Sequence, residues 1–344
     1  MAYFSAMIEY KGATIQELFF QKIKEEPQTQ NLLQTEFSPS EEETLKRIFL
    51  KPFEGTINTY QFKHEVDLEL NVLFQLSRKV DQEEKLDEAA EGIVSHLVTS
   101  SRHPNIKEGE LFIVKFSEIM LGTEIVNGLG IFKAEKKDSF LETPDWTKEP
   151  SLLFKEGIGE KKLDKACLIL FTPEPYTILA YDNNSSEAVY WKNDFIGLDF
   201  KRDHVNDTNH FLQMTKSYIT DQLPEEFEVS KTDQIDLLNK SIGYFKNHEE
   251  FDQGEFELEV FGDASAISSF RHFDKQYQEE MDLELSDTFK IATNSVKKQA
   301  RIFKSVLKLD KNFHVYIHGN RELIERGEDE NGRKYYKIYY ENES

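Results

Sequence analysis

The pattern of apolar residues changes near residue 205, and this change limits the folds open to the chain. Before it, short apolar runs such as Ala166–Phe171 recur, which is typical of strands. After it, segments such as Lys231–Lys246 place apolar residues at helical spacing,. We therefore predict an α+β protein with a sheet-containing, mixed α/β domain over 1–205. A mainly helical domain over 206–344 should follow and end in a small β unit.

Shorter signals refine this division. Ser40-Glu41-Glu42-Glu43 fits a capping box and predicts a helix start,. The apolar run Asn71–Leu76 predicts a strand, and Gln82–Thr99 predicts an amphipathic helix,. Gly128-Leu129-Gly130 lacks the third glycine of a dinucleotide-binding loop, so we interpret it as a turn,. Asn331-Gly332 predicts a β-hairpin near the end of the chain,.

Length and cysteine content exclude several classes of protein. A chain of 344 residues exceeds the usual size of one hydrophobic core, so two domains are expected,. The single cysteine, Cys167, excludes an internal disulfide and a cysteine-rich zinc site,. Its apolar neighbours predict a buried strand residue. No stretch is long and apolar enough for a membrane span, and Met1–Ile15 lacks a secretory signal pattern, so we expect a cytoplasmic protein,.

The formal net charge of −22 argues against nucleic acid as a partner, because such a chain repels a polyanion at long range,. However, the Debye length is about 8 Å at physiological salt, so distant carboxylates are largely screened. The electrostatic field at the contact surface therefore determines whether a nucleic acid binds. A nucleic-acid-binding hypothesis therefore needs a local basic surface.

One stretch meets that need, because residues 288–309 contain no Asp or Glu. Apolar residues recur there at helical spacing, at Val296, Ala300, Phe303 and Leu307,. Basic residues recur at the same spacing on another face, at Lys297, Arg301, Lys304 and Lys308, with Lys298 at the edge. We predict one helix with a buried face and a basic face about 16 Å long, enough to meet several DNA phosphates.

A solvated helix that pairs with the protein's own carboxylates would show the same spacing. An ordinary surface helix mixes charges of both signs, however, so the acid-free stretch favours DNA contact. The sequence shows no helix-turn-helix, zinc-finger or homeodomain signature, so contact with backbone phosphates is expected in place of base recognition.

Other constellations point to chemistry more weakly. Glu135-x-Lys137 with Pro144-Asp145 has the residue types of a metal-dependent nuclease, but in reversed order. His314 and His318 share a predicted strand face and lack a third zinc ligand,. Trp191 suits base stacking or, more readily, a core position,. The chain has no phosphate-binding loop,. We therefore expect no catalytic residues, no metal and no cofactor.

Several ordered segments carry a resemblance to a known family. They are Leu45–Phe53 (LKRIFLKPF), Ser100–Phe112, Gly128–Glu135 (GLGIFKAE), Lys161–Ile169, Tyr190–Phe195 (YWKNDF) and Phe303–Phe313. Together the sequence resembles the bacterial nucleoid-associated proteins of the NdpA or YejK type over roughly residues 40 to 318. The resemblance implies association with the nucleoid and DNA binding, either direct or through partners. It implies no catalytic residues.

These arguments lead to a nucleoid-associated protein that binds double-stranded DNA through its phosphates without strong sequence preference. The main alternative is an acidic adaptor that joins the nucleoid through other nucleoid proteins, and a metal-dependent nuclease ranks below it. No membrane partner is expected, and the sequence leaves the oligomeric state open.

Overall fold

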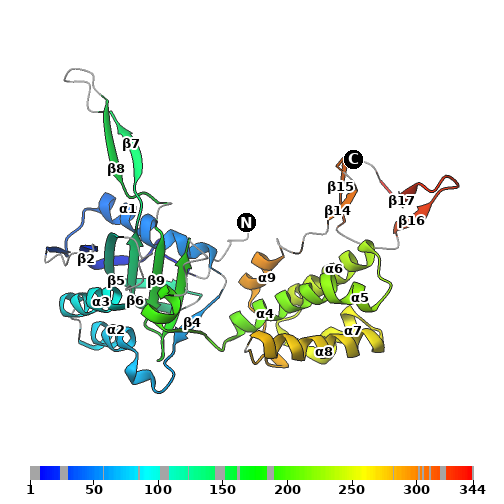
Figure 1. The fold of residues 1–344 in the computed structure, drawn as a ribbon, viewed down its shortest axis with the longest axis horizontal. Helices are drawn as coiled ribbons and strands as arrows, with labels where there is room; N and C mark the ends of the chain where they lie inside the picture. Colours follow the sequence, from blue (N-terminus) through cyan, green and yellow to red (C-terminus); the bar gives the residue numbers. More distant parts are fainter. Residues whose placement is uncertain are drawn as a thin grey trace. The chain divides into compact units, whose positions relative to one another are not determined.

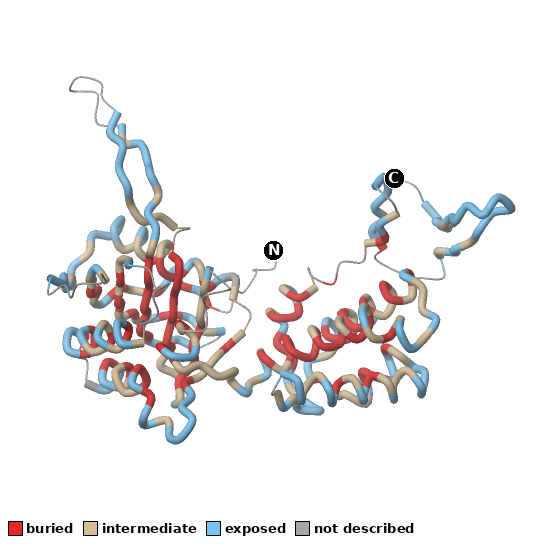
Figure 2. The backbone as a smooth tube through the Cα atoms, viewed as in Figure 1, coloured by how far each residue is buried: buried red, intermediate tan, exposed pale blue. Residues whose placement is uncertain are grey.

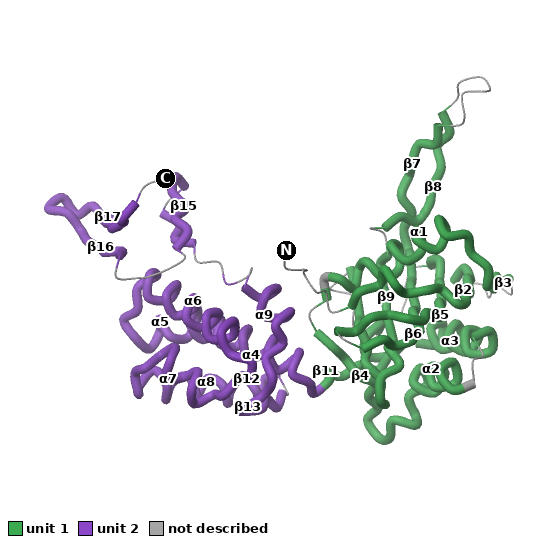
Figure 3. Tube along the Cα trace, turned by 180° about the vertical axis from the view of Figure 1, so that it is seen from behind, with its two compact units in different colours: residues 1–201 green, residues 202–344 purple. Residues whose placement is uncertain are grey.

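The computed structural model divides the chain into two compact units, Met1–Lys201 (unit 1) and Arg202–Ser344 (unit 2) (Figures 1 and 3). The sequence predicts two domains with a boundary after residue 205. That each unit folds independently stays a prediction. The structure describes residues 8–23, 30–56, 58–83, 86–100, 108–122, 124–143, 152–160, 163–183, 190–281, 283–300, 303, 306–309, 311–317 and 323–342.

Unit 1 is built on an antiparallel sheet. Within the described residues its strand order is β11-β4-β10-β9-β6-β5-β2-β3, and β1 pairs with β5. The strands are β1 (Ile8–Glu9), β2 (Thr14–Ile23), β3 (Asn31–Gln34), β4 (Tyr60–Phe62), β5 (Gly109–Leu121), β6 (Glu124–Ala134), β9 (Lys165–Leu170), β10 (Thr177–Asp182) and β11 (Leu198–Phe200). All described pairings are antiparallel, and the strand predicted at Ala166–Phe171 is confirmed as β9.

Helices cover both faces of this sheet. They are α1 (Pro39–Leu50), α2 (Val72–Glu83) and α3 (Leu86–Ser100), with 3-10 turns η1 (Lys51–Gly55) and η2 (Leu68–Leu70). Alternate residues of β9 serve the two faces: Cys167 joins the core under α2 and α3, and Leu168 joins the core under α1. The central strands are therefore buried on both sides (Figure 2), which explains their unbroken apolar runs.

A row of charged side chains lies at one end of the α2–α3 face. Lys133, Lys165 and Asp182 are direct neighbours across β6, β9 and β10. Lys165 Nζ lies 3.0 Å from a carboxylate oxygen of Asp182, and Lys133 Nζ lies 2.8 Å from one of Glu135. The ring of Tyr190, in the π-helical segment η3 (Tyr190–Ile196), covers the Lys165 ammonium at 5.2 Å. These charges are buried and therefore depend on their partners,.

A two-stranded ribbon projects from unit 1, formed by β7 (Asp138–Glu142) and β8 (Leu153–Gly157) (Figure 1). It exposes large apolar side chains, including Phe140 and Phe154, and Phe154 is 84% exposed. Leu141 and Phe154 are direct cross-strand neighbours, and adjacent exposed apolar side chains are unusual on a solvated surface,.

Unit 2 is mainly helical around an aromatic core. Its helices are α4 (His204–Ser217), η4 (Tyr218–Gln222), α5 (Leu223–Glu226), α6 (Lys231–Asn247), α7 (Gln253–Val260), α8 (Ala264–Met281) and α9 (Thr293–Gln299). Phe211 of α4 lies near its centre, with its ring centroid 4.2 Å from that of Phe251 and 5.1 Å from that of Phe256. No helix in the described part of the chain is long and apolar enough to cross a membrane.

Short two-stranded sheets complete unit 2. Their strands are β12 (Glu250–Asp252) with β13 (Thr288–Lys290), β14 (Val306–Leu309) with β15 (Phe313–Tyr316), and β16 (Ile324–Glu328) with β17 (Lys334–Ile338). Gly332 has a φ of 75° between β16 and β17, as the predicted hairpin at Asn331-Gly332 requires. The predicted α+β class, with a β unit at the end, is confirmed.

Three local predictions were wrong. Asn71–Leu76 lies mostly in helix α2, because a short apolar run fits a buried helix as well as a strand,. Gly128–Gly130 lies inside strand β6, where a Cβ on Gly130 would come within 2.4 Å of the Phe132 ring, so packing requires the glycine. The capping box uses Ser38 and Glu41, two residues earlier than predicted, because Pro39 fits the first helical position,.

Cys167 should resist thiol reagents in the folded protein. It is fully buried on β9, and burial raises the pKa of its thiol well above the ordinary value, so the reactive thiolate is suppressed. Labelling by a chromogenic disulfide reagent should be slow under native conditions and complete within minutes in urea. Equal rates in the two conditions would contradict the buried placement.

The Lys165–Asp182 pair gives a second prediction. Lys165→Met should lower the free energy of unfolding by about 3–5 kcal/mol, because it removes the cation that pairs with the buried Asp182 carboxylate,. The double variant Lys165→Met/Asp182→Leu should recover most of that loss. Urea denaturation measures both, and an equally unstable double variant would show that the lysine acts through packing alone.

Candidate nucleic-acid interface

The basic surface predicted from the sequence begins on helix α9. Its inner face is buried through Ser295, Val296 and Gln299 and rests on α4 and α6. The turn before it is fixed by a hydrogen bond of 3.0 Å from the Ala292 backbone N–H to Thr208 Oγ1. Lys297 lies on the exposed side of this anchored helix. The cation is therefore carried by a short element whose position is set by packing.

The structure corrects the prediction that one continuous helix carries the residues from Val296 to Lys308. Helix α9 ends at Gln299, and Lys308 lies on strand β14, opposite His314 of β15. Leu307 is buried in a small cluster with Ile235 and Ile317. Strand pairing with Phe313–Tyr316 outweighs the helical preference of the segment, because tertiary context overrides weak local propensity. The basic residues therefore do not form one helical stripe.

The cations of this segment differ in their surroundings. Lys297 and Lys308 are exposed, and within the described residues neither pairs with a carboxylate. Lys298 is half-buried, and Arg301 and Lys304 lie outside the described residues. In the described part of unit 2, the cations that form ion pairs include Arg202, Lys240, Arg271 and Lys337. Lys297 and Lys308 thus keep their charge directed to solvent.

Acidic groups lie at the start of α4, the helix that supports α9. Asp203 caps α4 by accepting hydrogen bonds from the backbone N–H groups of Val205 and Asn206. Burial, reinforced by the charge of Asp203, raises the pKa of Asp207 from 3.8 to about 6. Part of the acidic charge here is therefore removed in mildly acidic solution.

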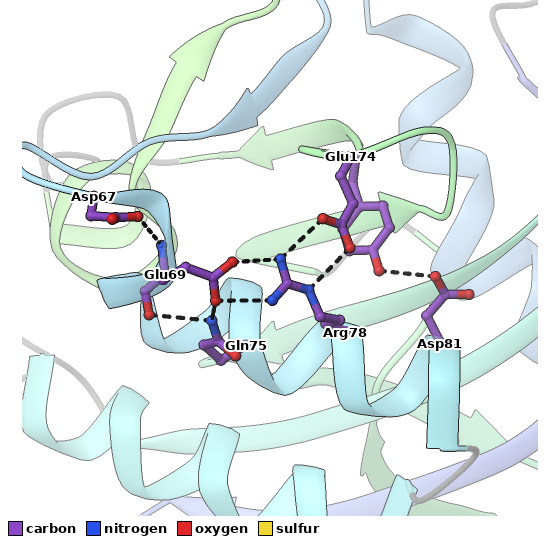
Figure 4. A network of polar contacts seen from close by, with 7 residues as sticks. Asp67, Glu69, Gln75, Arg78, Asp81 and Glu174 are labelled. Carbon is purple, nitrogen blue, oxygen red and sulfur yellow. Dashed lines mark hydrogen bonds and ion pairs between the residues drawn. The ribbon is translucent and has the colours of Figure 1, made fainter.

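Arg78 of α2, unlike the exposed Lys297 and Lys308, pairs with carboxylates of its own unit. Its guanidinium lies 2.7 Å from a carboxylate oxygen of Glu69 and 3.0 Å from one of Glu174 (Figure 4). Tyr176 donates a hydrogen bond of 2.9 Å to Asp81 of the same helix. These contacts tie α2 to the segment between β9 and β10. A phosphate would have to displace two carboxylates to reach Arg78.

The described members of the weaker sequence constellations have other partners or lie in the core. Glu135 pairs with buried Lys133, whereas Lys137 pairs with Glu110 at 2.7 Å, so the two residues of the nuclease pattern have separate partners. Trp191 is completely buried, as a core aromatic is. His314 lies on β15. Pro144, Asp145 and His318 lie outside the described residues.

Sequence reasoning missed the buried row formed by Lys133, Lys165 and Asp182. Isolated charges at the ends of apolar runs were the available signal, in Phe132-Lys133-Ala134 and Asp164-Lys165-Ala166. Periodicity alone cannot bring three strands together, so the row becomes visible only through the sheet register.

A comparison with protein families shows to which family the chain belongs. The family model described as nucleoid-associated protein YejK matches residues 16–342, which includes most of strand β2 and all of the acid-free stretch 288–309. The chain belongs to this family. The resemblance found in the sequence is thereby confirmed, and it extends beyond residues 40 to 318 at both ends. No curated protein matches the sequence.

The raised pKa of Asp207 predicts a pH dependence of stability. Because the folded-state pKa exceeds the unfolded value, this group's contribution is most favourable below about pH 4 and is lost as pH rises through about 6,. Asp207→Asn should therefore stabilise the protein relative to wild type more at pH 7 than at pH 4.5. Urea denaturation at the two pH values measures this difference.

Glu225→Gln, at an exposed carboxylate of the same unit, is the matched control and should show little pH-dependent difference from wild type. An identical effect of Asp207→Asn at both pH values would contradict the prediction.

Proposed function

We propose that this member of the nucleoid-associated family binds duplex DNA directly, through backbone phosphates, with unit 2. The proposed contacts are Lys297, Lys298, Arg301, Lys304 and Lys308. The observation that carries the proposal is the acid-free stretch 288–309, in which Lys297 and Lys308 are exposed and unpaired within the described residues. In a chain with a net charge of −22, such a stretch provides a local attraction for a polyanion,.

The supporting elements suit phosphate contact. Val296 and Gln299 hold α9 from its buried side, and Leu307 holds β14. Because side chains alternate along a strand, the buried Leu307 turns neighbouring Lys308 to the opposite face. Anchored cations lose less conformational freedom on binding than cations on a free tail. Phosphate contacts fix position but carry no sequence information, so weak sequence preference is expected.

A second candidate function is an acidic adaptor that joins the nucleoid through protein partners. The exposed cross-strand pair Leu141 and Phe154 of the β7–β8 ribbon supports it, because neighbouring apolar side chains on a projecting element suit a protein contact,. The net charge of −22 supports the same function. The two functions separate experimentally, because only direct binding requires the basic segment of unit 2.

Direct binding predicts a defined salt dependence. If Lys297, Arg301, Lys304 and Lys308 each meet a phosphate, log K should fall with log salt concentration at a slope of about −3.6. Each single change to Ala should reduce the magnitude of the slope by about 0.9 and weaken binding equally for unrelated duplexes. Fluorescence anisotropy with two duplexes across a salt series measures both effects.

Lys240→Ala is the matched control, because Lys240 lies in the same unit and already pairs with Asp236 at 3.0 Å. It should leave the slope unchanged, and thermal melts should show that all variants remain folded. A quadruple Ala variant that binds with wild-type affinity and slope would reject the proposed surface. A folded wild-type protein that binds no duplex DNA would favour the adaptor.

A further inference from the structure

Three potential metal ligands converge where helix α6 meets helix α7. His248 directly follows α6, and Glu255 and Glu259 lie one turn apart on α7. The Nε2 atom of His248 lies 3.9 Å from a carboxylate oxygen of Glu255 and 3.6 Å from one of Glu259. One donor atom from each residue falls within 4.8 Å of the other two. The three groups therefore surround one small volume.

The orientation of the imidazole is set by a neighbouring tyrosine. The Nδ1 atom of His248 lies 3.0 Å from the Tyr244 carbonyl oxygen. Because a carbonyl can only accept, Nδ1 carries the hydrogen, and Nε2 is the nitrogen that faces the carboxylates. The two rings stack with centroids 4.1 Å apart, and Tyr244 Oη donates a hydrogen bond of 3.1 Å to Glu255 Oε2. Tyr244 thus orients two of the three groups, as residues behind metal ligands do.

The tyrosine is itself held firmly. It is buried in the aromatic core, and its hydroxyl also accepts a hydrogen bond of 3.2 Å from the Asp252 backbone N–H. Asp252 caps α7 by accepting from the Glu255 backbone N–H at 2.9 Å. The start of α7 and the ring of His248 are therefore positioned by one buried residue.

A cation between the two carboxylates would relieve their mutual repulsion. Glu255 and Glu259 are like charges at i and i+4, which destabilises a helix,. Glu259 also lies in the last turn of α7, where the helix dipole disfavours negative charge,. A protonated His248 would need N–H···O distances of about 2.7–3.2 Å to bond either carboxylate. The observed 3.6 and 3.9 Å exceed that range.

A small side-chain adjustment would bring these donor atoms to the spacing of ligands that share one metal ion. Zn²⁺ bonds to imidazole nitrogen and carboxylate oxygen at about 2.0–2.2 Å, so two ligands of a tetrahedral ion lie roughly 3.4 Å apart. We propose that His248, Glu255 and Glu259 bind one Zn²⁺ ion, with the fourth position open to solvent. A mixed nitrogen and oxygen set with an imidazole favours Zn²⁺ over Mg²⁺, which prefers six oxygen ligands.

Isothermal titration calorimetry tests the site. Untagged, chelator-treated full-length protein is titrated with ZnCl₂. The wild type should show one tight site per chain that millimolar MgCl₂ does not displace. Glu259→Gln should weaken Zn²⁺ binding at least about tenfold, as loss of one ligand requires. Because Glu259 is half-exposed, this variant should remain folded. His248→Ala should weaken binding similarly.

Two matched controls test the assignment to this cluster. His272→Ala removes an exposed histidine elsewhere in unit 2, and Glu249→Gln removes an exposed carboxylate next to His248. Both should keep wild-type affinity. A wild type with no tight site, or a Glu259→Gln variant that binds as the wild type does, would overturn the proposal. DNA binding by the Glu259→Gln variant should be unchanged, because the ligands lie outside the basic segment.

Discussion

The aromatic contacts around Phe211 are the interaction on which the arrangement of unit 2 depends. This one ring touches rings from β12, α7, α8 and β13, including Phe251, Phe256 and Phe270. Aromatic side chains bury large areas in preferred tilted geometries, so they fix both the spacing and the angle of the elements that carry them. Tyr244 and Val296 belong to the same core. The orientation of His248 and the support of α9 therefore have a common physical origin.

The sequence predicted best the elements that are buried on a regular pattern. Strand β9 is covered on both faces, so its apolar run is easily recognised in the sequence,. The segment Lys231–Lys246 shows helical spacing over four or more turns and forms helix α6. The short run at Asn71–Leu76 failed because length and periodicity do not separate a strand from a helix at that scale.

In the segment of the candidate site, the sequence predicted which apolar residues are buried but not the shape of the backbone. The spacing of Val296, Phe303 and Leu307 correctly indicates buried positions. The chain nevertheless changes from helix to strand between the first and the last of them, because Leu307 finds its contacts beside Ile317 of the same β unit. The His248 cluster gave no signal, since its residues come from two elements and one of those, α7, was not predicted.

The buried charges of unit 1 have a consequence for how the sheet assembles. Every residue of β9 is buried, so apolar side chains on both faces would tolerate a slip of one residue along β6 and β10. Such a slip moves each side chain to the opposite face. It would carry Lys165 away from Asp182 and out from under Tyr190, leaving an ammonium and a carboxylate in apolar surroundings,. The lysine thus selects one strand register over the registers shifted by one residue, which would otherwise bury equally apolar side chains.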